Sequence, residues 1–396
     1  MNLKELIRKK PAILIGAAAV VVAVVVLLIV LLSGGGQSGT DLSGSGNGAS
    51  VTGAPGGESP AGSRPADAQP QITATATPAP ESHTAGEYTY CIREDGTAML
   101  TNRSDSGSGA VTLPEELDGI PVTGLMGSDV SDYCSATSVT IPASITHIEG
   151  NFFWNWEQLS RISAVEGHPT LESIDGVLFR KEDHTLLAFP PNWSSRYNTT
   201  EYHVPNGTLR IGRNAFSGAT LNAVRICDSV TELEPRSFWG LRARSISVGA
   251  GIRVLPADVF NISGLRTLVL YEGLEVIEPE AMAYCSEISE IMTRANRDGL
   301  YTNSSRFPES LRTVGDRAFV HSYSLTSIVF PEGVTAIGSH VFSEQCDSTR
   351  RVTLPRSLQS IGENAFGWSP IYTVYRGSYA AAWCESQTYR DISYED

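Results

Sequence analysis

Residues that could do chemistry are few in this chain and lie far apart. Seven histidines and six cysteines are spread over 396 residues. The sequence contains no H-E-x-x-H zinc motif, G-x-S-x-G nucleophile, G-x-x-x-x-G-K phosphate loop or C-x-x-C pair, each of which brings reacting groups together through short spacing. We therefore predict no catalytic residue, no metal site and no cofactor, and we expect that the protein is not an enzyme.

Residues suited to binding a partner are easier to find. Tyrosine, tryptophan and arginine are favoured at the energetic centres of protein interfaces. The candidates in this chain are His203, Arg225, Tyr271, Arg351 and Trp154. Whether one surface presents them depends on the elements that carry them.

A repeat of roughly twenty to thirty residues runs through most of the chain. An aromatic or apolar residue closes each unit, as Phe216, Phe238 and Phe260 do at steps of 22 residues. The series gives nine units between about Pro121 and Ser369. The closing positions are Val130, Phe153, Phe216, Phe238, Phe260, Met282, Phe319, Phe342 and Phe366.

Each unit begins with the pattern L-x-x-L-x-L, as in Leu265, Leu268 and Leu270. The last two apolar residues alternate with polar ones, which predicts a short strand with one buried face. A turn former such as Pro331 follows, and the second half of the unit is expected to form a bend and a short helical or 3-10 turn. Because one unit cannot bury its own apolar residues, we predict a mostly β repeat solenoid in which parallel strands stack one per repeat.

The closing half of the unit is similar to that of a known family. The phrase IGENAF, from Ile361 to Phe366, resembles the BspA-type leucine-rich repeat of cell-surface proteins, although Val130 and Met282 depart from the closing phenylalanine. The resemblance implies a repeat solenoid that serves adhesion, matrix binding or other partners. It does not imply one particular function.

Three longer segments extend the resemblance to the insertion and the two ends of the repeat region. The segments Tyr88–Leu125, Ser173–Asn192 and Tyr375–Ser386 resemble the family's N-terminal hairpin cap, its hairpin insertion and its closing segment. The resemblance thus implies a β-hairpin cap at 87–121, leucine-rich repeats at 122–369 with an insertion at 173–192, and a C-terminal cap at 370–396.

The N-terminal part of the sequence predicts on which side of a membrane the repeats lie. Ala12–Leu32 carries no charge and is long enough to span about 30 Å of hydrocarbon. Four basic residues precede it, and no Lys or Arg follows until Arg64. By the positive-inside rule we predict a cytoplasmic tail at 1–10, a transmembrane helix at 11–32 that acts as a signal anchor, and an extracellular repeat domain. A cleaved signal peptide stays open as the alternative.

The segment 33–86 consists mainly of Gly, Ser, Ala, Thr and Pro and is predicted to be a disordered tether. The whole chain has a formal charge of −14, of which the first ten residues contribute +3, so the exported part carries about −17. Such an acidic exterior repels nucleic acid. We therefore expect no nucleic-acid partner.

An exported chain with six cysteines raises the question of disulfides. Cys285 and Cys346 lie two repeats apart, about 10 Å by strand stacking, beyond the roughly 7 Å that a disulfide allows between Cα atoms. The resemblance implies that their slot, which Cys134 shares, is a small buried position. We expect core packing for these residues, and the pairing of Cys91 with Cys134 stays open.

Strand alternation predicts which residues face away from the core. The residue between the last two apolar positions should form an outward column that includes His203 and Arg225. Arg351 falls in the neighbouring column, and Tyr271 follows a strand. Of Trp154 and Trp156, one is expected to pack and the other to be exposed. Such a face either binds a partner or is only solvated, and the sequence leaves both open.

Two functions remain. The first is a membrane-anchored extracellular protein that binds a protein or glycan partner, in adhesion or another surface interaction. The second is an extracytoplasmic sensor or carrier subunit that acts through a membrane partner. The identity of the partner, glycosylation of the six N-x-S/T sequons and the oligomeric state do not follow from the sequence.

Overall fold

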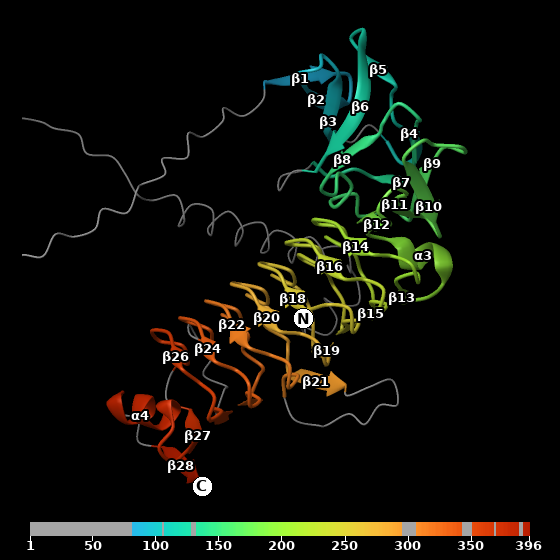
Figure 1. The fold of residues 1–396 in the computed structure, drawn as a ribbon. Helices are drawn as coiled ribbons and strands as arrows, with labels where there is room; N and C mark the ends of the chain where they lie inside the picture. The colour runs from blue at the N-terminus through green and yellow to red at the C-terminus, as the bar shows by residue number, and fades with distance from the viewer. Residues whose placement is uncertain are drawn as a thin grey trace, which may run out of the picture. The chain divides into compact units, whose positions relative to one another are not determined.

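Residues 81–396 are described by the computed structural model, apart from 105–106, 128–131, 295–305, 343–350, 368–369 and 388–390. The predicted tail and anchor and nearly all of the predicted tether lie outside this part of the chain. Within it, no helix is long and apolar enough to cross a membrane. Figure 1 shows the strands and the two short helices of the described residues.

The first strand lies inside the segment that was predicted to be tether. β1 (Ser82–Ala85) pairs antiparallel with β2 (Tyr88–Ile92), so the tether does not extend to residue 86. Gly86 makes this return possible because it adopts a φ of 58°, which is open to glycine without steric cost. Composition could not predict β1, because this strand contributes backbone hydrogen bonds rather than apolar side chains.

An antiparallel hairpin begins the repeat region. A turn at Arg93–Thr97, with Gly96 at a φ of 79°, joins β2 to β3. β3 then pairs in parallel with β6, which pairs with β5 and β8, so the hairpin and the first repeats share one sheet. The further strands of this sheet are β3 (Ala98–Arg103), β5 (Glu116–Leu117), β6 (Ile120–Met126) and β8 (His147–Glu149).

The predicted strands stack in parallel, one per repeat, and form what we call the first ladder. In its central part Val224, Ile246, Leu268 and Ile291 are successive register partners, and all four are buried. The strands of this ladder fall in three sheets. They are β4 (Gly109–Thr112), β7 (Ala136–Ile141) and β9 (Arg161–Ala164); β13 (Glu201–His203), β15 (Ala223–Arg225), β17 (Ser245–Ser247), β19 (Thr267–Tyr271) and β21 (Glu290–Arg294); β23 (Ser327–Val329), β25 (Arg351–Thr353), β27 (Ile371–Tyr375) and β28 (Ile392–Glu395).

The second half of each repeat differs from the prediction. Instead of a helical or 3-10 turn, it holds a two-residue strand followed by hydrogen-bonded turns, and these short strands stack as a second ladder. The second residue of each pair packs into the core; it is buried in β14 to β24, as with Ile211 and Leu233, and partly buried at Ile361 in β26. The strands are β14 (Arg210–Ile211), β16 (Glu232–Leu233), β18 (Val254–Leu255), β20 (Val276–Ile277), β22 (Thr313–Val314), β24 (Ala336–Ile337) and β26 (Ser360–Ile361).

Between the two ladders lies a continuous apolar core in which the closing aromatics stack. Phe216 and Phe238 have ring centroids 4.8 Å apart, and Phe260 follows at 5.4 Å. Phe319 and Phe342 are 4.9 Å apart further along. The predicted closing residues that the structure describes are therefore core residues, and each is at most 2% exposed.

The insertion forms a three-stranded antiparallel unit rather than a single hairpin. β10 (Leu171–Ile174) pairs with β11 (Val177–Arg180), which pairs with β12 (Thr185–Ala188). β12 then pairs in parallel with β14, so the insertion leads directly into the second ladder. The short helix α3 (Trp193–Tyr197) follows, and its Trp193 is buried.

A second helix lies near the C-terminus. α4 (Tyr379–Ser386) begins at Ser378, whose hydroxyl accepts a hydrogen bond from the Ala381 amide at 3.1 Å. Such an N-cap satisfies an amide that the helix leaves unpaired. Ala380, Ala381 and Cys384 pack into the core, and β27 and β28 on either side of the helix pair in parallel.

All five described cysteines are free, and Cys346 lies outside the described residues. Cys91 and Cys134 are therefore not joined, and the Cys134 Sγ instead accepts a hydrogen bond from Arg103 at 2.8 Å. Cys285 is fully buried, as predicted, and burial raises the pKa of its thiol to about 11. It is a core residue held by hydrogen bonds to Ser263 and the Phe260 carbonyl.

Candidate interaction surface

The outward face of the first ladder holds three of the predicted binding residues. His203 and Arg225 are register partners and are exposed, and the column continues through Ser247 to Val269. Val269 is nearly buried. Arg351 is also exposed, but it lies on β25 in a different sheet of the ladder. The structure thus brings His203 and Arg225 together and leaves Arg351 apart from them.

Tyr271 lies at the end of β19 and is already paired within the chain. Its register partner is Arg294, whose guanidinium donates a hydrogen bond to the Tyr271 hydroxyl at 2.9 Å and lies 5.7 Å from the ring centroid. The sequence analysis missed Arg294, because the long insertion after it hides the repeat period. The pair is half-buried, so Tyr271 is less available to a partner than an isolated tyrosine would be.

Trp154 lies away from the first ladder, in the turns that follow β8. Trp156 is fully buried, whereas Trp154 is half-buried and its ring packs edge-on against Trp239 with centroids 5.9 Å apart. The carbonyl oxygen of Trp154 would lie 2.5 Å from a Cβ placed on Gly218. Trp154 therefore contacts the turns of the central repeats, where Trp239 also lies.

Those turns contain a column of residues with left-handed backbone, two positions after each closing aromatic. Gly218 and Gly240 occupy it first, with φ of 74° and 64°. The next three repeats place Ile262, Tyr284 and His321 there, with φ of 59°, 59° and 60°. This conformation costs a residue with a Cβ about 1–2 kcal/mol and is rare for a β-branched residue such as Ile262. Glycine would be the more stable choice.

Hydrogen bonds between repeats fix this column. The amides of Gly240 and Ile262 donate to the carbonyls of Asn261 and Ala283 at 3.0 Å, and the Tyr284 amide donates to Val320 at 2.8 Å. Successive side chains are therefore carried at strand-like spacing, about 4.8 Å apart.

Aromatic rings continue the column on the outside. The Tyr284 and His321 rings stack with centroids 4.6 Å apart, and the His321 Nδ1 lies 2.8 Å from the Tyr323 hydroxyl. Ile262 is 44% exposed and Tyr323 is 36% exposed. We call this apolar and aromatic strip the turn edge. It consists of Trp154, Trp239, Ile262, Tyr284, His321 and Tyr323.

A second left-handed column lies two positions before each closing aromatic, and it is polar. Arg236 forms an ion pair with Asp258 at 3.5 Å, and Arg317 pairs with Glu280 at 3.2 Å. All four side chains are partly exposed, so each pair contributes at most about 1 kcal/mol. This column is a solvated charge ladder, which contrasts with the apolar turn edge.

Two buried polar residues hold the fold together near the N-terminal repeats. His168 is 1% exposed, with Nε2 3.1 Å from the carbonyls of Pro142 and Ile145. Arg103 is 3% exposed and makes two hydrogen bonds to the Glu87 carboxylate, at 3.1 and 3.0 Å. Both form hydrogen bonds that stabilise the fold.

The family of the chain follows from its repeats. The model of the BspA type Leucine rich repeat region matches in six copies over residues 125–195, 189–304 and 297–377, well over half of the sequence. The chain belongs to the BspA-type leucine-rich repeat family. Its fold is accordingly a mostly β parallel solenoid with few helices, as the two ladders show.

Solved structures of similar fold are bacterial leucine-rich repeat proteins. One from Eubacterium ventriosum shares 17% identity and a TM-score of 0.50, covering 72% of this chain and 93% of that one. The pneumococcal vaccine antigen PcpA shares 14% identity and a TM-score of 0.38, covering 80% of this chain and 99% of that one. No curated protein matches significantly. At these identities the first similarity supports the fold alone.

Sequence reasoning found one of the six turn-edge residues, Trp154, and missed the others. The available signal was the slot two residues after the closing aromatic, which reads Gly, Gly, Ile, Tyr, His through five successive repeats. A bulky residue that replaces a repeated glycine in such a slot indicates a position where the side chain has a role that offsets the free-energy cost of the left-handed backbone.

Proposed function

We propose that this BspA-type protein is a membrane-anchored, extracellular and non-catalytic binding protein that holds a protein partner on its turn edge. The observation that carries the proposal is the placement of Ile262, Tyr284 and His321 in left-handed slots where the preceding repeats have glycine. Strained positions of this kind persist where a side chain has a use that offsets their cost.

The chemistry of the turn edge suits a protein better than a glycan. Aromatic residues are enriched in protein interfaces, where they supply large contact area with few rotatable bonds. A sugar ring needs the open face of an aromatic side chain, and the stacking of Tyr284 on His321 covers one face of each ring. Their edges and the Tyr323 hydroxyl remain, together with the apolar Ile262. These groups match a partner that offers both apolar side chains and hydrogen-bond acceptors.

The outward face of the first ladder is the competing surface. It offers His203 and Arg225 side by side, but the rest of its central columns consists largely of small residues such as Ala223 and Ser245. Tyr271, the most favourable hot-spot residue near it, is engaged with Arg294. The turn edge therefore has the higher density of residues that stabilise interfaces.

The proposed location rests on the sequence. The uncharged run Ala12–Leu32, preceded by basic residues and followed by none until Arg64, favours an anchor with the repeats outside. Adhesion is one role for such a protein. A sensor or carrier subunit would use the same edge but would need a second membrane chain.

Photo-crosslinking tests the proposal. A photoreactive phenylalanine analogue replaces Tyr284 in one full-length variant and Arg225 in another, and intact cells that carry each variant are irradiated. We expect a polypeptide adduct from position 284 that disappears when Ile262 and Trp239 are also changed to glycine and alanine. Adducts from position 225 and none from position 284 would show that the partner binds the first ladder and not the turn edge. An adduct that glycosidase removes would instead indicate a glycan.

A further inference from the structure

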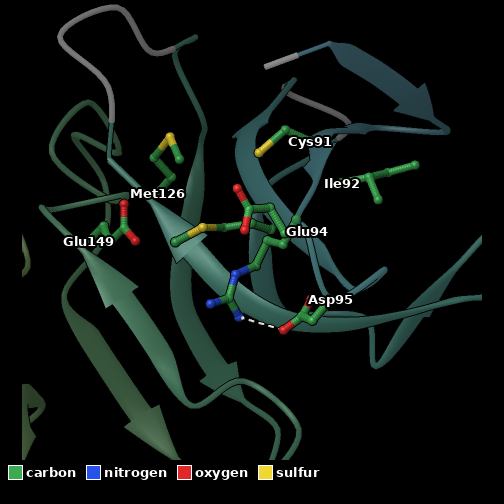
Figure 2. Close-up of a pocket in the computed structure, with 8 residues that line it drawn as sticks. Cys91, Ile92, Glu94, Asp95, Met126 and Glu149 are labelled. Carbon is green, nitrogen blue, oxygen red and sulfur yellow. Dashed lines mark ion pairs between the residues drawn. The ribbon is translucent and has the colours of Figure 1, made fainter. Parts of the chain in front are cut away.

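A pocket of about 490 Å³ lies at the N-terminal sheet (Figure 2). Its lining contains three sulfur-bearing side chains, Cys91, Met99 and Met126. The chain has only five methionines and six cysteines in 396 residues, so three sulfurs in one pocket are a marked concentration. The carboxylates of Glu94, Asp95 and Glu149 also line it.

Strand register brings the sulfurs together. Cys91 on β2 and Met99 on β3 are direct partners, so their Cβ atoms lie about 4.5–5.5 Å apart on one face. Met99 pairs in turn with Gly124 on β6, and a Cβ on Gly124 would lie 3.2 Å from the Met99 Cγ. The missing side chain lets Met99 extend over β6, the strand that carries Met126 two residues further on.

The Cys91 thiol is buried beside the pocket. It is only 4% exposed and lines the pocket, and it makes no hydrogen bond to another described residue. Cys134, Cys227 and Cys285 have such partners, and Cys384, which like Cys91 has none among the described residues, lies in the core and does not line this pocket. A buried thiol behaves as a small apolar group with a weak donor, so the Cys91 sulfur is available to a ligand that enters the pocket.

The donor set selects one class of ligand. Among the described residues, no three His, Cys, Asp or Glu side chains converge closely enough to hold a metal ion, which disfavours zinc and the hard cations. Thiolate and thioether sulfurs prefer soft monovalent ions. A single positive charge also neutralises one thiolate, so the filled site carries no net charge into a buried position.

We propose that Cys91, Met99 and Met126 form a binding site for a soft monovalent metal ion of the copper(I) class. The ion binds the Cys91 Sγ as a thiolate and displaces its proton to solvent, and the two methionine Sδ atoms complete the coordination. The Arg93 guanidinium also lines the pocket and is paired with Asp95 at 3.4 Å, which leaves the carboxylates of Glu94 and Glu149 at the rim to attract the cation (Figure 2). This site departs from the sequence expectation that no metal is bound.

Silver(I) is the probe, because it is soft and monovalent and needs no reductant. Native mass spectrometry of the full-length chain in detergent micelles gives the stoichiometry, and competition titration gives the affinity. We expect one silver ion and one released proton per chain at this site. The double variant Met99→Leu/Met126→Leu preserves packing volume and should bind at least about tenfold more weakly. Cys91→Ser should abolish the site.

Two matched variants control for adventitious binding. Cys227→Ser removes a more accessible thiol and Met292→Leu removes a methionine of the first ladder, and both should leave the affinity unchanged. Unchanged affinity in the double methionine variant, or loss in Cys227→Ser, would overturn the proposal. Tighter binding of zinc(II) than of silver(I) would overturn the ligand class. If Cys91→Ser fails to fold, Met126→Leu alone, at a half-buried position, gives the comparison.

Discussion

At the scale of single residues, the buried His168 has a structural role. Its Nε2 faces two carbonyl oxygens, and its Nδ1 accepts hydrogen bonds from the amides of Leu171 at 3.0 Å and Thr170 at 3.3 Å. An imidazole that donates through one nitrogen and accepts through the other is neutral. The His168 ring thus serves as hydrogen-bond partner for backbone carbonyl and amide groups of the surrounding turns.

Stability should therefore fall at acidic pH through His168. Burial lowers the pKa of this imidazole below its usual value of about 6.5, with the charge of Lys181 acting in the same direction and the hydrogen bonds to Pro142 and Ile145 opposing it. Between the two pKa values the His168 imidazole is protonated in the unfolded chain and neutral in the folded chain. Above about pH 6.5 His168 does not make the free energy of unfolding depend on pH. Below about pH 6.5 it lowers the free energy of unfolding by up to about 1.4 kcal/mol per pH unit.

Urea unfolding at pH 7.5 and pH 5.0 measures this loss. His168→Gln should flatten the difference between the two pH values, although it lowers stability at both. The exposed His203→Gln should keep the wild-type difference. A slope that His168→Gln leaves unchanged would place the titration elsewhere.

The ion pair between Arg103 and Glu87 lies within the N-terminal hairpin, at the end of β3 and in the turn before β2. The Arg103 guanidinium also lies 5.7 Å from the Trp156 ring. Glu87→Gln leaves a buried guanidinium without its counterion and should cost about 2–3 kcal/mol, less than for a wholly buried pair because Glu87 is 28% exposed. Glu275→Gln breaks the exposed pair with Arg253 and should cost under about 0.5 kcal/mol. Equal melting temperatures for both variants would contradict this.

At the scale of elements, glycine decides how closely adjacent repeats approach. A Cβ on Gly338 would lie 2.5–2.7 Å from the Asp316 carboxylate oxygen, the Asp316 amide nitrogen and the carbonyl carbon of Gly315. A Cβ on Gly362 would meet Gly338 and Ser339 of the preceding repeat in the same way. This is the physical reason for glycine in the phrase IG-x-x-AF.

Gly338→Ala should therefore destabilise the protein by more than about 2 kcal/mol, because backbone atoms must move apart. Gly264→Ala is the matched control. Its φ is not positive and the nearest atom to its Cβ would be 3.9 Å away, so the change should be neutral or slightly stabilising. Thermal melts of both variants test the contrast, and a comparable loss in each would refute the close-approach argument.

The stacked aromatics set the stability of each repeat. Phe238 is fully buried between Phe216 and Phe260, so Phe238→Ala should cost about 3–5 kcal/mol. Ser245→Ala on the outward face of the same region should change stability by less than about 0.5 kcal/mol. Denaturant titrations give both values, and a loss under 1 kcal/mol for Phe238→Ala would show that the core repacks.

How far the sequence predicted these elements depends on the signal that each one leaves. The first ladder and its core were predictable, because apolar alternation and a recurring step of 22 to 24 residues both encode them. The second ladder was not, because strands of two residues such as β14 and β16 are too short to alternate. The turn edge was mostly missed, since a left-handed backbone has a sequence signature only when glycine occupies it.

At the scale of the whole molecule, the predicted topology places the repeats outside the membrane. Protease added to intact cells with the wall opened should release the fragment from about residue 81 onward by cutting in the polar segment after the anchor. A reporter fused before Met1 should stay protected and serve as the control. Full protection of the repeats, while a known surface protein is cleaved, would reverse the orientation.

The register of the first ladder allows whole repeats to be lost or gained during evolution. Ala223, Ser245 and Thr267 occupy equivalent places at steps of 22 residues, and their neighbours make the same backbone bonds. A genetic deletion of residues 223–244 would set Ser245 beside Glu201, where Ala223 now lies, without a change of frame or face. Recombination between repeats can therefore lengthen or shorten the gene product while it still folds, and the turn edge changes length with it.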